Sequence, residues 1–374
     1  MPQNNRYDVI IVGGGLAGLT CALHLSARGK RILLIEKNSY PSHKVCGEYI
    51  SNEVLPYLAT LGIDPFQLGA KKIDRFQLST KKGKSLTVSL PLGGFGISRY
   101  AFDNYLYQKI VETDRVIIDS VRDIQFINDQ FKVRTQKGHW ALAPYVVGAF
   151  GKRGNLDHFL DRPFIKRKTP WLAIKAHYKG NLPDNLVALH MFDGGYCGLS
   201  KVEMDSVNVC YMVQSEKFKK FRNIDSFQKE ILYQNPNLDE FFSTASMIFQ
   251  APVAISQISF QQKSQVEKHV FMVGDSAGLI HPLCGNGMAM AIQAAKIFSD
   301  CYLTAEKEKW SRNQLEKTYT HRWNAAFSNR LRIGALVQRV FLNNTAMDVS
   351  TRILQTAPTL VPKIISRTHG KALA

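Results

Sequence analysis

Residues 8–18 read Asp-Val-Ile-Ile-Val-Gly-Gly-Gly-Leu-Ala-Gly. Residues 8–12 are mainly β-branched, as is typical of a strand buried in a parallel sheet. Gly13 permits a tight turn out of that strand, Gly15 lets a pyrophosphate approach the backbone, and Gly18 lets the next helix pack against the strand. The stretch therefore predicts a dinucleotide-binding turn.

The residues after this turn complete a βαβ unit. Residues 16–28 carry helix formers and end at Gly29, and residues 31–35 form a second apolar run with Glu36 at its end. The positive end of the helix dipole would face the phosphates, and the Glu36 carboxylate could accept hydrogen bonds from both ribose hydroxyls. An acid here, with no arginine nearby, disfavours a 2′-phosphate on the nucleotide.

A distant segment, residues 273–288, indicates which dinucleotide binds. It reads Val-Gly-Asp-Ser-Ala-Gly-Leu-Ile-His-Pro-Leu-Cys-Gly-Asn-Gly-Met. Asp275 could accept a hydrogen bond from a polyol hydroxyl. The backbone amides of residues 285–288 would open a helix whose N-terminus stabilises the negative N1–O2 edge of a reduced flavin. Together with the first motif, this segment predicts FAD.

Between these two motifs the pattern changes to antiparallel strands. Residues 73–79 and 84–90 alternate as in a hairpin, and dense strand signals fill residues 171–213. A further buried strand is expected at 270–273, a helix from about Met288, and mainly helix from Trp310 onward. No linker marks a clean boundary, so we expect interleaved domains.

Composition excludes several classes of protein. The formal charge of +18 suggests an anionic partner or ligand, but no nucleic-acid module is recognisable. The six cysteines show no CxxC pair and no zinc spacing, so neither a disulfide framework nor a metal site is expected. There is no signal peptide and no window of 18 apolar residues, which predicts a cytoplasmic protein with peripheral membrane attachment still allowed.

These motifs resemble the para-hydroxybenzoate hydroxylase superfamily of FAD-dependent oxidoreductases, in the branch that includes geranylgeranyl reductases. The resemblance rests on residues 13–18 with Glu36, on Arg99 in Ser-Arg-Tyr-Ala-Phe-Asp, and on Gly274-Asp275 with residues 282–287. It implies that Arg99 reaches the FAD pyrophosphate and that Asp275 binds the ribityl chain.

The resemblance also implies the fold class. We expect an α/β protein with a Rossmann-like FAD/NAD(P)-binding domain of the GR2 type, an antiparallel β-sheet substrate domain and a C-terminal helical region. The FAD-binding domain is assigned to 1–70, 95–155 and 255–310, the substrate domain to 71–94 and 156–254, and the helical tail to 311–374. The predicted cofactor-binding residues are Gly13, Gly15, Leu16, Ala17, Gly18, Glu36, Lys37, Cys46, Gly47, Arg99, Gly274, Asp275, Pro282, Gly285, Asn286, Gly287 and Met288.

Catalytic and substrate-pocket candidates are fewer. Lys-Val-Cys-Gly-Glu-Tyr at 44–49 resembles the Cys-Gly segment that lies beside the isoalloxazine ring in geranylgeranyl reductases, so Cys46 is a candidate to touch the flavin or act chemically. His281 could donate to a substrate oxygen or assist proton transfer, although a structural role is common at such a corner. Tyr196 and Tyr211 lie on strands expected to face the pocket.

Two departures from the family pattern bear on the reaction. Phe150 stands where hydroxylases usually carry an Asp that helps to bind both cofactors, which puts transient NAD(P)H binding in doubt. Lys152 and Arg153 could hold a phosphate instead, or form a solvated basic turn. Residues 195–201 lack the Trp and Pro of the reductase motif and the Trp-rich motif of halogenases.

Three functions therefore stay open. The leading expectation is a monooxygenase that hydroxylates or epoxidises a hydrophobic or carrier-bound small molecule, using NAD(P)H or a partner reductase. The alternatives are flavin-dependent reduction of alkene bonds in a lipid or polyketide, and a non-catalytic flavin-binding redox module. The tail from 310 carries +8 and mixes cations with apolar residues. It is expected either to cap the FAD domain or to contact a membrane surface or an acidic carrier protein.

Overall fold

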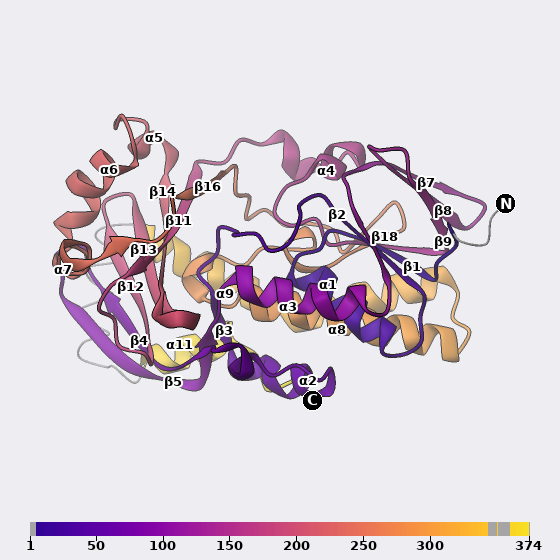
Figure 1. The fold of residues 1–374 in the computed structure, drawn as a ribbon, viewed down its shortest axis with the longest axis horizontal. Helices are drawn as coiled ribbons and strands as arrows, with labels where there is room; N and C mark the ends of the chain where they lie inside the picture. The colour runs from indigo at the N-terminus through magenta and orange to yellow at the C-terminus, as the bar shows by residue number, and fades with distance from the viewer. Residues whose placement is uncertain (1–4, 343–349, 351–359, 374) are drawn as a thin grey trace.

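The computed structural model of the chain describes residues 5–342, 350 and 360–373. Two large sheets lie at opposite ends of an elongated molecule, with helices between and alongside them (Figure 1). Both sheets draw on segments far apart in sequence, so the chain passes between the two ends repeatedly. The candidate site lies where these crossings meet.

The first sheet is built around the strand that precedes the glycine turn. Its strand order is β17-β18-β10-β1-β2-β6, and β18, β10, β1, β2 and β6 run parallel. Its strands are β1 (Val9–Val12), β2 (Ile32–Glu36), β6 (Arg115–Ile118), β10 (Tyr145–Gly148), β17 (Val266–Glu267) and β18 (Val270–Met272). All four residues of β1 are buried, as its β-branched run predicts.

Four helices accompany this sheet. α1 (Leu16–Ser26) packs against α3 (Arg99–Val111) and α8 (Gly287–Lys307), and α8 packs against α9 (Arg312–Leu342). The predicted βαβ start and the helix near Met288 are therefore confirmed. A small antiparallel sheet of β7 (Val121–Ile127), β8 (Gln130–Thr135) and β9 (Trp140–Ala143) lies beside them.

The second sheet has nine strands and is mostly antiparallel. Its order is β15-β11-β14-β13-β12-β4-β5-β3, with β16 paired to β11. One pair, β12 with β4, is parallel, and β4 pairs antiparallel with β5 on its other side. Its strands are β3 (Tyr49–Ser51), β4 (Lys71–Ser79), β5 (Ser85–Gly96), β11 (Trp171–Lys179), β12 (Leu186–Phe192), β13 (Gly195–Lys201), β14 (Val207–Gln214), β15 (Ser246–Met247) and β16 (Val253–Ser256).

Successive side chains along each strand point to opposite faces of this sheet. One face packs on a cluster that includes α6 and α7, and the other packs on Leu279 and Leu283. The remaining helices are α2 (Leu55–Thr60), α4 (Asn155–Phe159), α5 (Ser215–Phe218), α6 (Ile224–Ile231), α7 (Pro236–Thr244) and α11 (Leu360–Thr368). The combination of a parallel sheet, a largely antiparallel sheet and C-terminal helices confirms the predicted fold class.

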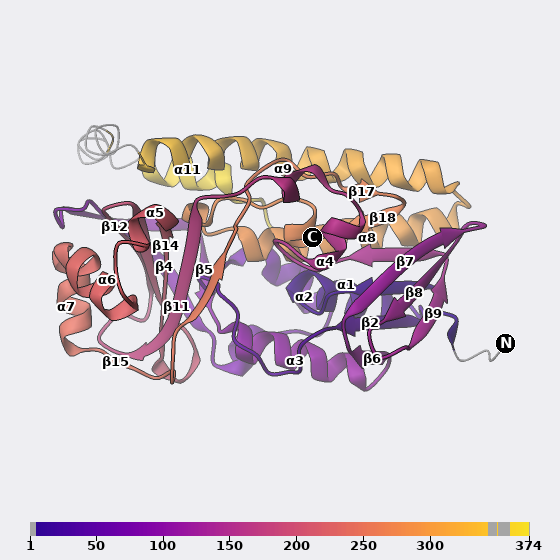
Figure 2. The ribbon, with the colours of Figure 1, turned by 90° about the horizontal axis from the view of Figure 1, so that it is seen from above.

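The C-terminal helices pack on the rest of the protein. Figure 2 shows α9 running along one side of the molecule past both sheets. Gly334 allows a close approach, because a Cβ there would lie 3.1 Å from the Ile280 side chain. α11 packs on α9 and β5, and the Asn286 side chain donates to the Thr368 carbonyl at 2.7 Å. Residues 343–349, 351–359 and 374 of the predicted tail lie outside the described residues.

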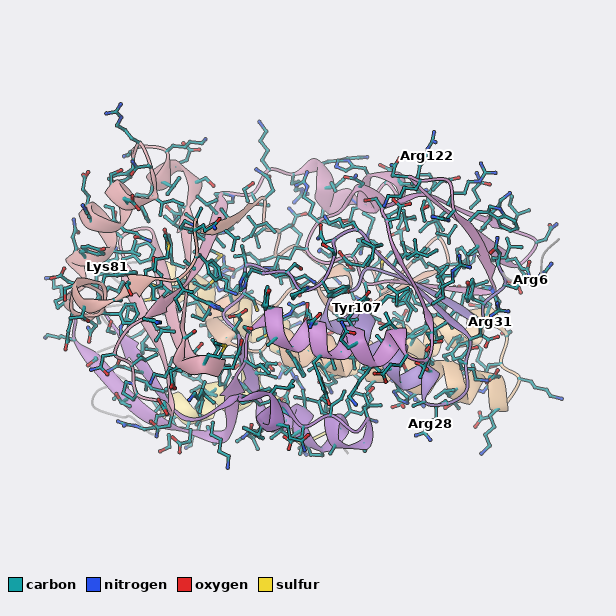
Figure 3. The ribbon with its side chains drawn as sticks, in the orientation of Figure 1. Arg6, Arg28, Arg31, Lys81, Tyr107 and Arg122 are labelled. Atoms are coloured by element: carbon teal, nitrogen blue, oxygen red, sulfur yellow. The ribbon has the colours of Figure 1, made fainter. Side chains whose placement is uncertain are left out.

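Positive charge is spread over the surface. Figure 3 shows Arg6, Arg28, Arg31 and Arg122 at the outer edge of the half with the parallel sheet, and Lys81 at the far end of the other half. Within the described residues, no helix is long and apolar enough to cross a membrane.

Candidate functional site

The glycine turn follows β1 and shows a different constraint at each glycine. Gly13 has φ of +108°, and a Cβ there would lie 2.3 Å from the Ala149 carbonyl oxygen. A Cβ on Gly18 would lie 1.9 Å from the Gly13 carbonyl oxygen. Both positions therefore require glycine for backbone packing.

Gly15, by contrast, has open space beside its Cα. A Cβ at this position would meet only the Arg99 guanidinium, at 3.6 Å. α1 begins at the next residue with no side-chain cap and no acid in its first turn, so its first N–H groups are available to an anion. The cradle between Gly15, the first turn of α1 at Leu16 and Ala17, and Arg99 therefore fits a pyrophosphate.

Glu36 stabilises this cradle from the end of β2. One carboxylate oxygen accepts from the Gly14 N–H at 2.6 Å and the other from the Asn38 N–H at 3.0 Å. Tyr40 donates to the Gly14 carbonyl at 2.5 Å and stacks on Tyr107 of α3, a residue labelled in Figure 3. The carboxylate keeps lone pairs for ribose hydroxyls, while Lys37 beside it is exposed.

Arg99 begins α3 and is held by a neighbouring acid. Its guanidinium donates twice to Asp103, at 2.6 and 2.7 Å, and Lys44 donates to the same carboxylate at 2.9 Å. Burial opposes the charge on Arg99, but Asp103 raises its pKa above the ordinary value; the two cations lower the pKa of Asp103 against the effect of burial. The resemblance identified Arg99, whereas the part of Lys44 in orienting it was missed.

The segment after β18 lies directly against the glycine turn. Gly274 has φ of +61°, and a Cβ there would lie 2.9 Å from the Cβ of Ala17. Asp275 is half-buried, and its main-chain carbonyl accepts from Lys263 at 2.7 Å. Lys263 also donates to the Lys152 carbonyl at 2.9 Å, and burial lowers its pKa to about 8. The fold thus brings the two sequence motifs together, with Lys263 as a link that sequence reasoning missed.

A second uncapped helix N-terminus follows. His281 leads into a single turn of 3-10 helix (Pro282–Cys284), Gly285 adopts φ of +63°, and α8 starts at Gly287. Met288 lies in its first turn, which contains no acid, and Asn286 before it makes no side-chain cap. Two open helix N-termini therefore fit the two parts of FAD that carry or develop negative charge, which are the pyrophosphate and the N1–O2 edge of the reduced flavin.

The loop at 44–49 is held by the nine-stranded sheet. Asn208 donates to the Cys46 carbonyl at 3.2 Å and Ser200 to the Gly47 carbonyl at 3.1 Å. A Cβ on Gly47 would meet nothing within 4 Å, and the Cys46 side chain is partly buried. The main chain of this loop is therefore positioned by strands β13 and β14, with open space at Gly47.

A buried ionic cluster secures the end of this loop. Glu48 is fully buried with φ of +55°, and its carboxylate accepts from Lys175 at 2.5 Å, from His177 at 2.7 Å and from the Arg99 N–H at 2.7 Å. Burial alone would raise the pKa of Glu48, but Lys175 and His177 lower it below its ordinary value. We call Glu48, Lys175 and His177 the ionic cluster. Its sequence signal is a Lys and a His alternating within an otherwise apolar strand.

An apolar layer lies farther along the same face. It joins the second sheet to the 279–283 segment and includes Leu78, Trp171, Ala173, Leu189, Met191, Tyr196, Met212, Ile258, Leu279 and Leu283. His281 lies at its border, with ring centroids 4.6 Å from Phe260, 5.9 Å from Tyr196 and 6.4 Å from Trp171. The structure thus brings together two of the candidates, His281 and Tyr196.

Tyr211 does not share this environment, which corrects the expectation that both tyrosines face the pocket. It packs in the cluster beneath α6, and its hydroxyl accepts from Gln228 at 3.3 Å. Tyr196 pairs with Met212 across the ladder, so the neighbouring Tyr211 points to the opposite face.

The basic side chains in the turn after Phe150 donate hydrogen bonds to main-chain carbonyls of the protein. Lys152 donates to the Val45 carbonyl at 3.5 Å and Arg153 to the Ile165 carbonyl at 2.9 Å. Phe150 packs close to Gly148 and Gly154. Among the residues that the structure places, no group of His, Cys, Asp and Glu could hold a metal ion.

Comparisons with known proteins agree with this geometry. Residues 6–330 match the family model described as "FAD binding domain". The chain is 21% identical to "Conditioned medium factor receptor 1" of Dictyostelium discoideum, over 96% of this chain and 74% of that protein. It is 24% identical to "Digeranylgeranylglycerophospholipid reductase" of Methanocaldococcus jannaschii, over 86% and 83%. A solved triple variant of the flavin-dependent brominase Bmp2 superposes with a TM-score of 0.79 at 17% identity, over 96% and 94%, which shows a shared fold.

Proposed function

The chain belongs to the FAD-binding-domain family and is an FAD-dependent oxidoreductase, and on this premise we propose that it oxygenates a hydrophobic small molecule by hydroxylation or epoxidation. The glycine turn, Glu36 and Arg99 would hold the adenosine and pyrophosphate of FAD, and Asp275 with the N-terminus of α8 would hold the ribityl chain and the flavin edge. When bound, FAD would supply the redox chemistry of the reaction.

The apolar layer supports a hydrophobic substrate. It lies between the nine-stranded sheet and the Leu279 and Leu283 side chains, next to the segment proposed to hold the flavin edge. Its members are nearly all buried, so they exclude water from a substrate placed among them. Exclusion of water also limits side reactions of reactive intermediates.

The observation that favours oxygenation over alkene reduction is the weakness of the acids in and beside the apolar layer, which are two thiols, a phenol and an imidazole. Reduction of a carbon–carbon double bond requires a proton delivered to carbon. Burial raises the pKa of Cys210 and of Cys284 to about 12 and that of Tyr196 well above its ordinary value, and it lowers the pKa of His281 to about 3. These groups therefore stay neutral and are poor general acids near neutral pH.

The test uses the FAD-loaded protein reduced by light under anaerobic conditions, so that no nicotinamide donor is needed. It is mixed with ¹⁸O₂ and a panel of apolar phenols and alkenes in D₂O buffer, and the products are examined by mass spectrometry. Incorporation of one ¹⁸O atom is expected. Products that have gained two deuterium atoms and no ¹⁸O would overturn the proposal and favour the second candidate.

That second candidate is reduction of alkene bonds in a lipid or polyketide. It is supported by the placement of the Cys46-Gly47 segment against the substrate sheet and by the similarity to a lipid reductase. In this case Cys46→Ser is expected to lower alkene reduction, while oxygenation by the first candidate would be little changed.

The electron donor is proposed to be NAD(P)H or a partner reductase. Phe150 and the engagement of Lys152 and Arg153 with protein carbonyls favour the partner reductase. Anaerobic mixing of the loaded protein with NADH and with NADPH tests this: no bleaching of the flavin bands by either is expected, and rapid bleaching would contradict it.

An acidic carrier protein is the proposed partner of the tail. Leu336 of α9 is 59% exposed and lies between the exposed cations Arg332 and Arg339. Because α9 packs on α8 through its other face, charge reversal is a better test than truncation. Arg332→Glu with Arg339→Glu is expected to abolish salt-sensitive binding to an acidic acyl carrier protein, while equal binding to anionic vesicles instead would favour a membrane surface.

A further inference from the structure

Two polar groups in the apolar layer lack partners. The Tyr196 side chain is 4% exposed and His281 is 3% exposed, and neither the Tyr196 hydroxyl nor the His281 Nε2 has a hydrogen-bond partner among the described residues. An unsatisfied buried polar group costs about 1–3 kcal/mol. Two such groups in one apolar cluster therefore call for a specific explanation.

The hydrogen-bonding character of both groups is defined by their surroundings. His281 Nδ1 accepts from the Leu283 N–H at 3.4 Å, so the neutral ring carries its proton on Nε2 and offers a donor there. Burial keeps the imidazole neutral and the phenol protonated. The layer therefore presents an N–H and an O–H donor from rings whose centroids are 5.9 Å apart.

We propose that Tyr196 and His281 together bind one oxygen acceptor, a carbonyl or hydroxyl oxygen, on an otherwise apolar substrate. The inference rests on the proposed function for the role of this site, and it adds the polar feature by which the substrate is recognised and oriented. The rest of the substrate would contact Trp171, Met212 and Leu283.

Specificity follows from the free-energy cost of burying the Tyr196 and His281 donors without an acceptor. An analogue that lacks the oxygen buries both donors without a partner, whereas a ligand that carries it satisfies them. Phe260 and Val337 border the layer and are only partly buried, so they form its edge toward solvent.

The experiment measures equilibrium binding to the oxidised, FAD-loaded protein, with no turnover. The probes are matched pairs of increasing size that exchange a hydroxyl for a methyl group: phenol and toluene, 2-naphthol and 2-methylnaphthalene, and 4-heptylphenol and 4-heptyltoluene. Perturbation of the flavin spectrum and quenching of flavin fluorescence report binding. Failure of the oxygenation test would leave this measurement unaffected.

The variants isolate each donor. Tyr196→Phe removes only the hydroxyl, and His281→Asn keeps an acceptor near the Leu283 N–H but removes the Nε2 donor. The expected preference of the wild type for the hydroxyl probe is tenfold or more, and each substitution should lower it about tenfold for the pair that binds best. Tyr211→Phe, on the opposite face, is the control that leaves the preference unchanged.

Three results would overturn the proposal. Equal affinity for both members of every pair would show that the donors hold water. Failure of every hydroxyl probe to bind would show that the layer is closed core, and a preference that survives both substitutions would place the polar contact elsewhere.

Discussion

The two ends of one sheet face use buried polar groups in opposite ways. At the ionic cluster, Glu48 accepts hydrogen bonds from Lys175, His177 and the Arg99 N–H. At the apolar layer, the Tyr196 hydroxyl and His281 Nε2 have no partner among the described residues. Strand β11 contributes to both ends, with Trp171 and Ala173 in the layer and Lys175 and His177 in the cluster.

This difference separates a structural role from a binding role. A buried charge whose partners all come from the protein fixes elements relative to one another, and here it joins the loop at 44–49, α3 and the nine-stranded sheet. A buried donor without a partner is costly unless a ligand or water completes it. The cluster is therefore expected to determine stability, and the layer to determine specificity.

The largest effect is expected from Lys175→Met. This change leaves the Glu48 carboxylate buried with one counter-charge fewer, which costs about 3–5 kcal/mol. Urea unfolding measures the loss. Lys219→Met, which breaks an exposed pair with Glu216, is the control and should leave the free energy of unfolding nearly unchanged.

A double variant sharpens the same point. Glu48→Gln with Lys175→Met removes both charges, so it should recover a large part of the loss seen in Lys175→Met alone. Equal unfolding free energies for Lys175→Met and the wild type would show that the cluster is not the structural centre of this face.

A smaller effect is expected from acid at the apolar layer. Burial lowers the pKa of His281 to about 3 from an ordinary value of 6.5, so between these values the unfolded chain binds more protons than the folded one. Stability attributable to the neutral ring is complete above pH 6.5 and is lost as the pH falls. Relative to His281→Asn, the wild type should lose about 2 kcal/mol more between pH 7 and pH 5.

The comparison of the wild type with His281→Asn also controls for the other titrating groups. His190 and His369 also have pKa values lowered by burial to about 4. The pKa of Glu48 is lowered too, so its contribution to the stability of the protein is lost as the pH falls toward that pKa. These groups are present in both proteins, so their contributions cancel. Parallel pH profiles for the two proteins would show that His281 is not held neutral.

A still smaller change in unfolding free energy is expected when Tyr196→Phe is compared with Tyr211→Phe. The Tyr211 hydroxyl accepts from Gln228, so its removal should cost about 1 kcal/mol. The Tyr196 hydroxyl has no such partner, so its removal should leave the ligand-free protein as stable or up to about 1 kcal/mol more stable. A loss at Tyr196 as large as that at Tyr211 would reveal a hydrogen bond from the protein and would weaken the proposed binding role.

The smallest effect is expected from Cys46→Ser, between the two ends. The loop is held through the main-chain carbonyls of Cys46 and Gly47, which the substitution leaves in place. Unfolding free energy should change by less than about 0.5 kcal/mol. A larger loss would show that the thiol itself packs into the junction.

Much of the region around the glycine turn could be predicted from local sequence. The β-branched run of β1, the three glycines and Glu36 lie within one βαβ unit, and short-range spacing determines their arrangement. The close approach of Gly274 to Ala17 was not predicted, since the two residues are far apart in sequence and only a shared cofactor linked their motifs.

The rest depends on pairings that sequence does not reveal. Glu48 and Lys175 are separated by 127 residues, and an alternating Lys and His in a strand does not say which acid they meet. Whether Tyr196 or Tyr211 lies in the apolar layer depends on which side of the nine-stranded sheet packs on Leu279 and Leu283. Strand period alone leaves that side undetermined. The hydrogen bond from Asn286 to Thr368 joins the tail to the start of α8 in a way that no local motif indicates.

The central claim is that the cradle between Gly15 and Arg99 binds FAD, and the most direct test is FAD retention by purified wild type and Gly15→Val. Gly15 has φ of −81°, so valine fits the backbone while its side chain fills the open space beside Arg99. The wild type is predicted to show both flavin absorbance bands with one FAD per chain. Gly15→Val is predicted to fold with an unchanged circular dichroism spectrum and to bind no FAD. A folded wild type that takes up no added FAD, or a variant that binds it equally well, would contradict the account.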